Sequence, residues 1–459
     1  MAEQPTVLVM AAGRGTRMRS SLPKVLHPVC GRPMLHWVAA AAREAGAGRV
    51  VCITRPGDGV SETLPPGLEA AEQREGEGTG AAVLAAREQI AGASTVVILS
   101  GDHPLLTGEL VHALLLTHER EAAAATVLTT EELDPTGYGR VVRGDDGRVE
   151  RIVETKESRG VSPDDLAVRE VNLGTYAFSG SELLTALDAI AETAGELYLT
   201  SVFPLLRAAA GGVVAHLTSD TSSAMGVNNR VDLMAVEAMA RRRLLEAHAL
   251  AGVTFTLPAT VTLEAGVEIG QDTVIGPGVS LRGATRIGRA CEVGAHSTLI
   301  DATLGDGASV LHSHLVECRV ADGASVGPFA YLRPRAQLEA GAKVGTFVEV
   351  KNSRIGPGAK VPHLSYVGDA DIGERANVGA GAITANYDGR RKHRTTIGAG
   401  AKTGVHTAFV APVSVGDAAY TGAGSVITGD VPAGALGISR PKQRNIEGYA
   451  KRVEEKPGQ

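Results

Sequence analysis

Two patterns of apolar residues follow one another along the chain, and the change between them falls near residue 250. Before it, short β-branched runs alternate with stretches rich in alanine and leucine, as in Thr6–Val9, Met34–Glu44 and Val50–Thr54. This alternation predicts βαβ units and a mostly parallel sheet. Further strands are predicted at Thr95–Leu99, Ala124–Leu128 and Asn172–Phe178, with a hairpin over Arg140–Val153 around Asp146 and Gly147.

Two helices have recognisable boundaries or faces. Pro33 is expected just inside the start of the first helix, and Gly46 just past its end. From Asn228 to Leu250 the sequence becomes helix-forming and amphipathic, which predicts a linker helix. Its broad apolar stripe consists of Leu233, Val236, Met239, Leu244 and Leu245.

After Ala251 an aliphatic residue recurs at every sixth position. The first series is Ile269, Ile275, Leu281, Ile287, Val293 and Leu299. The second series is Val320, Val326, Leu332, Leu338, Val344 and Val350. The third, slightly slipped, is Ile355, Val361, Val367, Ile372, Val378 and Ile383.

Hexapeptide repeats of this kind predict a parallel β-helix, whose coils bury their aliphatic residues only by stacking on their neighbours. Small residues after the aliphatic ones, as in Ile269-Gly270 and Val344-Gly345, let the chain turn after each short strand. Roughly 180 residues at eighteen per triangular coil give about ten coils. The repeat is interrupted between Ile383 and Ile397, and an insertion in a solenoid usually lies on its binding face.

Composition supports this division and excludes several classes of function. Glycine is 57 of 459 residues and aromatics are only 3%, as expected for many turns around a narrow interior that accepts little beyond Val, Ile, Leu and Ala. The net charge of −6 is not accompanied by a basic block, which argues against nucleic acid or an anionic membrane as partner. We therefore expect small-molecule chemistry.

The cysteines and the first residues bear on cellular location. Cys30, Cys52, Cys291 and Cys318 are far apart, with no CxxC motif and no histidine at metal-ligand spacing. This spacing predicts reduced thiols in a cytoplasmic protein. The first residues lack a basic segment, and their apolar run is too short for a secretion signal or a membrane span.

The first predicted strand leads directly into a glycine-rich segment, AAGRGTRM at residues 11–18, which is followed by Leu22-Pro23-Lys24. Met18 stands where a Rossmann fingerprint needs its third glycine, and no GxxxxGK[ST] segment occurs in the chain. What remains is a glycine-rich turn at the end of a strand, with Arg17 and Lys24 able to reach a polyphosphate. From these residues alone, a basic surface turn is an equal alternative.

This segment, with the LPK that follows it, resembles the sugar-1-phosphate nucleotidyltransferase superfamily. Further segments match in order and spacing, and with the repeats the match covers nearly the whole chain. The chain is similar to the bacterial bifunctional N-acetylglucosamine-1-phosphate uridylyltransferases / glucosamine-1-phosphate N-acetyltransferases, which make UDP-N-acetylglucosamine. The matching residues are Gln73, Gly78-Thr79, Gly101-Asp102, Gly137-Tyr138-Gly139, Glu154-Thr155-Lys156, Asn172 and Gly226-Val227-Asn228-Asn229.

The resemblance implies an α/β nucleotidyltransferase domain with a Rossmann-like mixed sheet, followed by a left-handed parallel β-helix that carries the acetyltransferase. We expect a uridylyltransferase domain at 1–227, the linker helix at 228–250, the β-helix at 251–437 and a tail at 438–459. Two reactions are implied: N-acetylation of glucosamine-1-phosphate by acetyl-CoA, then uridylyl transfer from UTP to N-acetylglucosamine-1-phosphate with release of pyrophosphate. The family also implies a homotrimer with the acetyl site between subunits.

In the first domain the resemblance implies a site for UTP, the sugar phosphate and Mg²⁺. Arg17 and Lys24 would stabilise the oxygens around the α-phosphorus during catalysis. Asp102 and Asn228 would bind Mg²⁺, although Asp102 taken alone is as readily a helix cap. Gln73 and backbone groups would read the uracil edge. The nucleotide site would consist of Met10, Ala11, Ala12, Gly13, Lys24, Gln73, Gly78 and Thr79, and the sugar site of Gly139, Glu154 and Asn172. Asn228 would also bind UTP or UDP-N-acetylglucosamine.

In the second domain the central residue is His363, in the segment VPHLSY. On its own it is more readily an exposed histidine on a coil, but the resemblance implies a general base for acetyl transfer. The Ala380 N–H would stabilise the oxyanion. Arg333, Lys351, Tyr366 and Asn377 would bind the sugar substrate, and Ala380, Asn386, Tyr387, Ala423 and Arg440 would bind acetyl-CoA.

Two positions depart from the family pattern, and two alternatives remain. Val405 stands where a serine is common, so a hydrogen bond to CoA is missing or is made by the backbone; Ser100 stands where an aromatic residue is common. One alternative is a single-activity nucleotidyltransferase whose β-helix assembles or regulates, and the other makes the repeats a trimerisation scaffold only. His363, the inserted loop and Arg440 argue against the first alternative.

Overall fold

The computed structural model describes residues 4–154, 161–191 and 197–454. Its contacts divide the chain into two units, Met1–Arg242 and Arg243–Gln459. The division falls inside the long helix α8 (Arg230–Leu250), which matches the predicted linker helix closely. In the part of the chain described, no helix is both long enough and apolar enough to cross a membrane.

The first unit is built on a mixed sheet. Its strands are β1 (Thr6–Met10), β4 (Arg49–Thr54), β5 (Glu69–Glu72), β6 (Thr95–Ser100), β7 (Ala125–Thr130), β8 (Arg140–Arg143), β9 (Val149–Val153), β10 (Val171–Ser179) and β11 (Val213–Leu217). The main path follows the order β11-β7-β10-β6-β1-β4-β5, in which β1, β4, β5 and β6 are parallel and β10 is antiparallel to both its neighbours. The predicted hairpin is the pair β8 and β9, which joins the sheet through β10.

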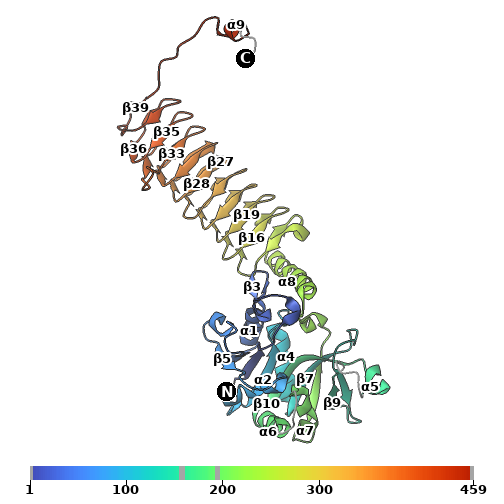
Figure 1. Ribbon diagram of the computed structural model, residues 1–459. Coiled ribbons are helices and arrows are strands. Elements are labelled where there is room, and N and C mark those ends of the chain that lie inside the picture. The colour runs from blue at the N-terminus through green and yellow to red at the C-terminus, as the bar shows by residue number, and fades with distance from the viewer. Residues whose placement is uncertain (1–3, 155–160, 192–196, 455–459) are drawn as a thin grey trace. The chain divides into compact units, whose positions relative to one another are not determined.

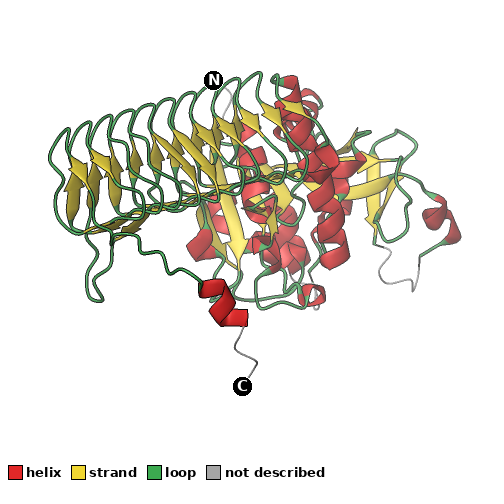
Figure 2. Ribbon diagram, turned by 90° about the horizontal axis from the view of Figure 1, so that it is seen from above, coloured by secondary structure: helices red, strands yellow, loops and turns green. Residues whose placement is uncertain are grey.

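Helices cover both faces of this sheet (Figure 2). They are α1 (Met34–Glu44), α2 (Thr79–Leu84), α3 (Arg87–Ile90), α4 (Gly108–Arg120), α6 (Gly180–Ala191) and α7 (Phe203–Arg207). The short helix α5 (Pro163–Ala167) has no buried residue and lies beside β8. Because side chains alternate along a strand, Leu8 and Ile98 pack in one core with α2, α3, α6 and α7, whereas Val9 and Leu99 pack in another with α1 and α4. Both faces are therefore apolar, as a largely parallel sheet requires.

The first helix has the bounds that the sequence predicts. α1 runs from Met34 to Glu44, and Gly46 follows it with φ of 89°, a conformation that favours glycine. Pro33 lies immediately before the helix rather than inside it, since it pairs in the short hairpin β2 (Pro28–Val29) and β3 (Arg32–Pro33). All four cysteines are buried, and Cys52, Cys291 and Cys318 are free thiols, as predicted.

In the second unit short parallel strands stack into the three walls of a β-helix (Figure 1). The first wall is β12 (Thr254–Phe255), β15 (Val274–Ile275), β18 (Glu292–Val293), β21 (Ser309–Val310), β24 (Ser325–Val326), β27 (Lys343–Thr346) and β30 (Lys360–His363). The second is β13 (Thr262–Leu263), β16 (Ser280–Arg282), β19 (Thr298–Ile300), β22 (His314–Val316), β25 (Tyr331–Leu332), β28 (Glu349–Lys351), β31 (Tyr366–Gly368), β33 (Ile383–Ala385), β35 (Ala408–Val410) and β38 (Val426–Ile427).

The third wall completes each coil. It consists of β14 (Glu268–Ile269), β17 (Arg286–Ile287), β20 (Thr303–Leu304), β23 (Arg319–Val320), β26 (Gln337–Leu338), β29 (Arg354–Ile355), β32 (Ala370–Ile372), β34 (Thr395–Ile397) and β36 (Val413–Val415). A separate pair, β37 (Tyr420–Thr421) and β39 (Leu436–Gly437), follows, and α9 (Tyr449–Glu454) lies in the tail. The second wall has 10 strands, which agrees with the predicted number of coils.

The predicted aliphatic ladder forms the core of this unit, with one error. Every member of the three series is buried except Ile269, which is partly buried, and Ile383. Ile383 is 49% exposed, and the neighbouring Thr384 occupies the interior position instead. Strict six-residue spacing from Val378 leads to residue 384, where the buried hydroxyl donates to the Gly368 carbonyl oxygen (2.9 Å) and accepts from the Gly368 N–H (2.8 Å). A satisfied threonine thus replaces the aliphatic residue.

This register predicts different losses in the free energy of unfolding for two truncations, although the sequence pattern places both residues in the aliphatic series. Leu332→Ala removes a fully buried side chain and is expected to lower the free energy of unfolding by about 2–5 kcal/mol. Ile383→Ala removes a half-exposed one, and the expected loss is under about 1 kcal/mol. Guanidinium unfolding of the full chain, followed by circular dichroism, measures both; equal losses would contradict the register.

Candidate active sites

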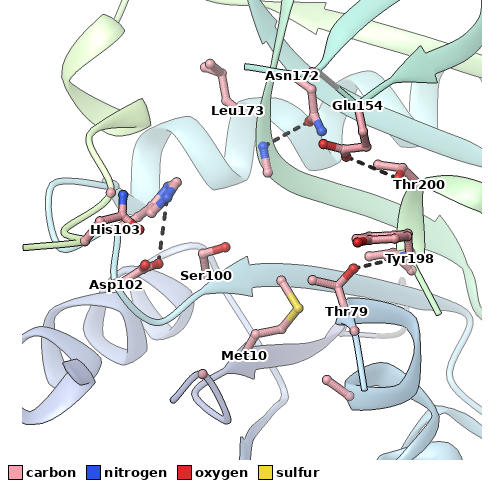
Figure 3. Close-up of a pocket in the computed structure, with 18 of the residues that line it drawn as sticks. Met10, Thr79, Ser100, Asp102, His103, Glu154, Asn172, Leu173, Tyr198 and Thr200 are labelled. Carbon is pink, nitrogen blue, oxygen red and sulfur yellow. Dashed lines mark hydrogen bonds and ion pairs between the residues drawn. The ribbon is translucent and has the colours of Figure 1, made fainter. Parts of the chain in front are cut away.

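A cavity of about 970 Å³ opens at the carboxyl ends of β1, β4, β5 and β6 (Figure 3). This edge is where open α/β sheets bind their ligands. Of the residues predicted for the first domain, the cavity is lined by Met10, Ala12, Gly13, Arg17, Lys24, Gln73, Gly78, Thr79, Asp102, Gly139, Glu154, Asn172 and Asn228. Ala11 is buried beside it and is absent from the lining. Thr155 and Lys156, which belong to a matching segment, lie outside the described residues.

The glycine-rich segment is held against Lys24. Gly15 has φ of 59°, and a Cβ there would lie 2.6 Å from the Cβ of Lys24. Only glycine permits both the left-handed backbone and this close approach. Met18, which replaces the third glycine of a dinucleotide fingerprint, is buried in the short helix at Thr16–Met18. The segment is therefore a turn that brings Arg17 and Lys24 to the cavity lining.

Two polar contacts join the predicted catalytic cations to the predicted metal ligands. The Lys24 ammonium forms an ion pair with Asp102 Oδ2, and both side chains are largely buried. Arg17 Nη2 donates to Asn228 Oδ1 at 2.8 Å. The backbone N–H of Val227 donates to the Asp102 carbonyl oxygen (3.0 Å), which ties the Asn228 segment to the end of β6.

The neighbours of Asp102 decide its charge. Burial alone would raise the pKa of the Asp102 carboxyl, but the adjacent His103 and Lys24 outweigh burial and hold this pKa below its ordinary value. Burial lowers the pKa of the His103 imidazole. His103 Nε2 lies 3.8 Å from Asp102 Oδ1 (Figure 3). Asp102 is therefore a carboxylate at neutral pH, with one oxygen committed to Lys24 and the other not.

The donor atoms here fit Mg²⁺ when substrate supplies the remaining ligands. Asp102 and Asn228 offer one carboxylate and one amide oxygen to the same cavity, and Mg²⁺ is often bound by one or two protein oxygens with phosphate and water. In the described part of the chain, no group of three or more His, Cys, Asp and Glu side chains is arranged to hold a metal. An ion at this place would complete its coordination with oxygens of substrate phosphate and water.

Gln73, Gly78 and Thr79 form the end of the cavity predicted to hold the base. The Gln73 side chain is buried, and its Nε2 donates to the Gly76 carbonyl oxygen at 3.1 Å. Gly78 precedes α2 with φ of 98°. Thr79 Oγ1 accepts from the Leu199 N–H at 2.9 Å. These contacts fix the loop between β5 and α2 against the cavity wall.

Asn172, Gly139 and Glu154, which are predicted to hold the sugar, form another part of the cavity lining. The backbone N–H of Asn172 donates to the Gly139 carbonyl oxygen (2.9 Å). Its side chain donates to the Tyr176 hydroxyl (2.7 Å) and accepts from the Gly174 N–H (3.0 Å). Glu154 Oε1 accepts from the Thr200 hydroxyl at 3.2 Å (Figure 3). The amide and carboxylate are thus held in fixed orientations before any ligand binds.

Several lining residues were not found from the sequence. Arg55 follows a predicted strand, so the rule that ligands bind at carboxyl ends could have indicated it. Tyr198 and Thr200, labelled in Figure 3, come from a segment without a motif, and nothing in the pattern points to them. They reach the cavity because the Gly80 N–H donates to the Leu197 carbonyl oxygen (2.7 Å) beside α2.

In the second unit the predicted acetyl-transfer residues lie on consecutive coils. His363 ends β30, has an exposed side chain and pairs in register with Thr346 of β27. Its carbonyl oxygen accepts from the Gly381 N–H (3.1 Å), which places Ala380 on the adjoining coil. Among the described residues, no hydrogen-bond acceptor is found for the Ala380 N–H. Asn377, also exposed, forms a parallel bridge with Lys360.

Asp369 organises this region, and the sequence analysis missed it. The buried carboxylate accepts from Asn352 Nδ2 and from Asn386 Nδ2 (2.5 Å) and lies 3.8 Å from Lys351 Nζ. Burial would raise the pKa of Asp369, but the two amides and the lysine lower it overall. The neighbouring Lys392 lowers the pKa of Lys351. The residues at 352, 369 and 386 are each 17 apart, the length of one coil, and this spacing could have indicated the contact.

The remaining predicted residues are more exposed. Tyr387 projects from the inserted loop, whereas its neighbour Asn386 is turned inward to Asp369. Arg333 Nη1 contacts Glu349 Oε1 at 2.8 Å on the wall that also carries Tyr366. Arg440 Nη1 donates to the Ala423 carbonyl oxygen (2.8 Å), so the two residues predicted for the CoA side are in contact.

Comparison with known proteins identifies both units. Residues 7–214 match the MobA-like NTP transferase domain, and residues 266–301 match the bacterial transferase hexapeptide (six repeats). The chain is 48% identical to the bifunctional protein GlmU of Streptomyces avermitilis over 98% of this chain and 95% of that protein. The chain belongs to the GlmU family. GlmU of Mycobacterium tuberculosis (strain CDC 1551 / Oshkosh) is 47% identical, over 98% of this chain and 93% of that protein.

As a member of the GlmU family, the chain is a bifunctional enzyme of UDP-N-acetylglucosamine synthesis, with uridylyltransferase and acetyltransferase activities. The predicted fold, a nucleotidyltransferase domain with a mixed sheet and a left-handed β-helix of hexapeptide repeats, is confirmed. A solved UDP-glucose pyrophosphorylase from Acinetobacter baumanii covers 54% of this chain and 98% of its own, at 17% identity and a TM-score of 0.41.

Two glycines at the cavity predict separable effects in this GlmU-family enzyme. A Cβ on Gly101 would lie 2.8 Å from the Met10 carbonyl oxygen, so Gly101→Ala is expected to cost about 1–3 kcal/mol of stability. A Cβ on Gly13 would meet nothing within 4 Å, so Gly13→Ala should leave the melting temperature unchanged while raising the KM for UTP. Thermal unfolding and uridylyl-transfer kinetics measure both; a destabilised Gly13→Ala would contradict the open space there.

Proposed function

We propose that the cavity of the first unit is the uridylyl-transfer site and that its predicted residues act as assigned. The supporting observation is that the residues predicted for phosphate, metal, base and sugar line one cavity at the carboxyl edge of the sheet. An oxygen of N-acetylglucosamine-1-phosphate attacks the α-phosphorus of UTP, and pyrophosphate leaves. Because phosphoryl transfer needs little covalent help, positioning and charge neutralisation account for the catalysis.

Arg17 and Lys24 are the proposed catalytic cations. In this structure the Arg17 guanidinium contacts Asn228 and the Lys24 ammonium contacts Asp102. Both cations are therefore oriented, but each is paired with a protein oxygen. On arrival of the triphosphate they would exchange these partners for phosphate oxygens, which form charge-assisted hydrogen bonds of the same kind. The exchange frees the oxygens of Asp102 and Asn228.

Mg²⁺ is the proposed metal, and Asp102 and Asn228 are the residues that would hold it. The ion would neutralise charge on the transferred phosphoryl oxygens. Support comes from the ionised state of Asp102 and from the chemistry of the two donors. Gln73, Gly78 and Thr79 would hold uracil, while Gly139, Glu154 and Asn172 would orient the sugar.

For the second unit we propose that His363 is the general base of acetyl transfer. The amine of glucosamine-1-phosphate attacks the thioester carbonyl of acetyl-CoA, His363 takes the amine proton, and the CoA thiol leaves. The unpaired Ala380 N–H among the described residues supports its role at the oxyanion. The buried Asp369 would keep Lys351 and Asn386 in place for the sugar phosphate and the acyl donor.

A homotrimer with the acetyl site between subunits completes the proposal. His363 and Asn377 are exposed, so one coil surface alone leaves that site open on one side. Phe329, Phe347 and Leu364 lie at successive turns and are 50, 57 and 61% exposed, and the two phenylalanine rings stack at 5.2 Å. Such a row of exposed apolar side chains supports an interface. The buried, free thiols of Cys52, Cys291 and Cys318 support a cytoplasmic location.

Two substitutions separate the activities. His363→Ala is expected to lower acetyl transfer by about 10²–10⁴-fold, since it removes the general base, and to leave uridylyl transfer intact. Asp102→Asn should lower uridylyl transfer by at least about 10²-fold, because the metal loses its charged ligand, and leave acetyl transfer intact. Both assays are run on each purified variant, with CoA thiol and pyrophosphate as products. Loss of both activities in either variant would contradict two independent sites.

A charge placed in the exposed apolar row tests the trimer. Wild type is expected to sediment at three times 47.2 kDa. Phe347→Glu should shift it to smaller species and reduce acetyl transfer, while uridylyl transfer persists. Leu205→Glu, at an exposed leucine of α7 in the first unit, is the control and should remain trimeric. A trimeric and fully active Phe347→Glu would show that this row is not the interface.

A further inference from the structure

Arg55 lies between the two segments assigned to the base. It follows the last residue of β4, the strand between β1 and β5. On one side the Ala11 N–H donates to the Ile53 carbonyl oxygen (2.9 Å), and on the other the Gln73 N–H donates to the Thr54 carbonyl oxygen (2.8 Å). Arg55 lines the cavity with Ala12 and Gln73. Neither a motif nor the family resemblance indicated it.

The backbone and Nε of Arg55 are held by hydrogen bonds, whereas its Nη groups have donors available for a ligand. Asp58 accepts from the backbone N–H groups of Arg55 (3.1 Å) and Val60 (2.9 Å), and Val60 is fully buried, so the turn after β4 is anchored. The Nε–H of Arg55 donates to the Ala12 carbonyl oxygen. Among the described residues, no acceptor is found for its Nη groups, and the side chain is half-buried. An anchored guanidinium with spare donors is suited to bind a ligand acceptor.

The charges of the cavity indicate which part of the nucleotide is nearest. Arg17 and Lys24, at the phosphate end, already supply cations to the triphosphate. At the base end the Gln73 amide nitrogen donates to the Gly76 carbonyl oxygen, so its carbonyl oxygen is the atom left for a ligand. With uracil placed as proposed above, that atom would accept from the ring N–H of uracil. The carbonyl oxygens beside that ring N–H then require donors, and Arg55 carries them.

We propose that Arg55 is a nucleotide-specificity residue whose Nη groups donate to a carbonyl oxygen of uracil. The proposal rests on the placement of uracil at the Ala12 and Gln73 end of the cavity, as proposed above. Since a hydrogen bond to a charged donor in a partly dry site contributes more than one between neutral groups, Arg55 would strengthen UTP binding without touching the reacting phosphorus.

The test is a comparison of Arg55→Met with wild type on three substrates: UTP, 2-thio-UTP and 4-thio-UTP. Sulfur is a weaker acceptor than oxygen, so each analogue weakens one uracil contact. Arg55→Met is expected to raise the KM for UTP about tenfold, with kcat within about twofold, because the lost contact is a binding contact. The penalty should shrink markedly for one of the two thio analogues. Arg55→Lys is expected to raise the KM for UTP nearly as much as Arg55→Met does, since lysine lacks the Nε anchor.

Arg74→Met is the matched control. Arg74 is an exposed arginine that pairs with Glu72 (2.8 Å) at the end of β5, outside the cavity lining, and its loss should leave all three KM values unchanged. Acetyl transfer, measured on every variant, reports whether the chain is folded.

Two results would overturn the proposal. One is a KM for UTP unmoved by Arg55→Met. The other is an equal penalty for UTP and both thio analogues, which would show that Arg55 acts only by holding the Ala12 carbonyl oxygen. Gln73→Ala distinguishes a failure of the underlying assignment, because a KM for UTP unmoved by that change would place uracil elsewhere in the cavity.

Discussion

Parallel strand pairing determines where the reactive side chains of both units lie. In the first unit it brings the carboxyl ends of β1, β4, β5 and β6 to one edge, so residues 10 to 102 converge although the chain separates them widely. In the second unit it stacks each coil on the next, so that residues one coil apart touch, as Asn352, Asp369 and Asn386 do. The same backbone geometry thus produces a single pocket in one case and a continuous surface in the other. The pocket of the first unit can enclose a nucleotide by itself. The coil surface of the second unit would need a second copy of the chain to enclose a ligand.

The charged groups at the cavity of the first unit are held in pairs that the proposed reaction would rearrange. A largely buried lysine is tolerated beside Asp102 because each group compensates the desolvation of the other. Such a pair adds little net stability, and leaving one member alone is costly. The arrangement is therefore better understood as preorganisation: the cations are already oriented toward the cavity, and the proposed Mg²⁺ would compensate the Asp102 carboxylate once phosphate oxygens replace it beside Lys24. Arg55 follows the same principle, since its Nε is anchored while its other donors are not.

Much of this could be predicted from the sequence, and the exceptions have physical causes. Periodicity located seven of the nine strands of the first sheet, α1 and the coils because burial acts through spacing, whereas β5 and β11 were not predicted. Family segments located most of the cavity lining. Ile383 was misplaced because apolar character was followed instead of the six-residue spacing, and a threonine that bonds Gly368 satisfies the interior equally well. Asp369, Tyr198 and Thr200 were missed because their roles depend on neighbours supplied by folding. Arg55 carries no signal beyond its place after a strand.

Separate cores make the two chemistries independent. The apolar cluster of the β-helix shares no residue with either cluster of the nucleotidyltransferase sheet. Even α8 contributes different residues to each: Glu237, in its first half, accepts from the Cys30 N–H (2.6 Å), whereas Leu244 and Leu245, in its second half, pack on the β-helix core. A substitution within one core therefore loses contacts in that unit alone, and effects at sites with no shared partners generally add. Within the described residues, the two units therefore share no apolar core through which packing changes could pass from one to the other.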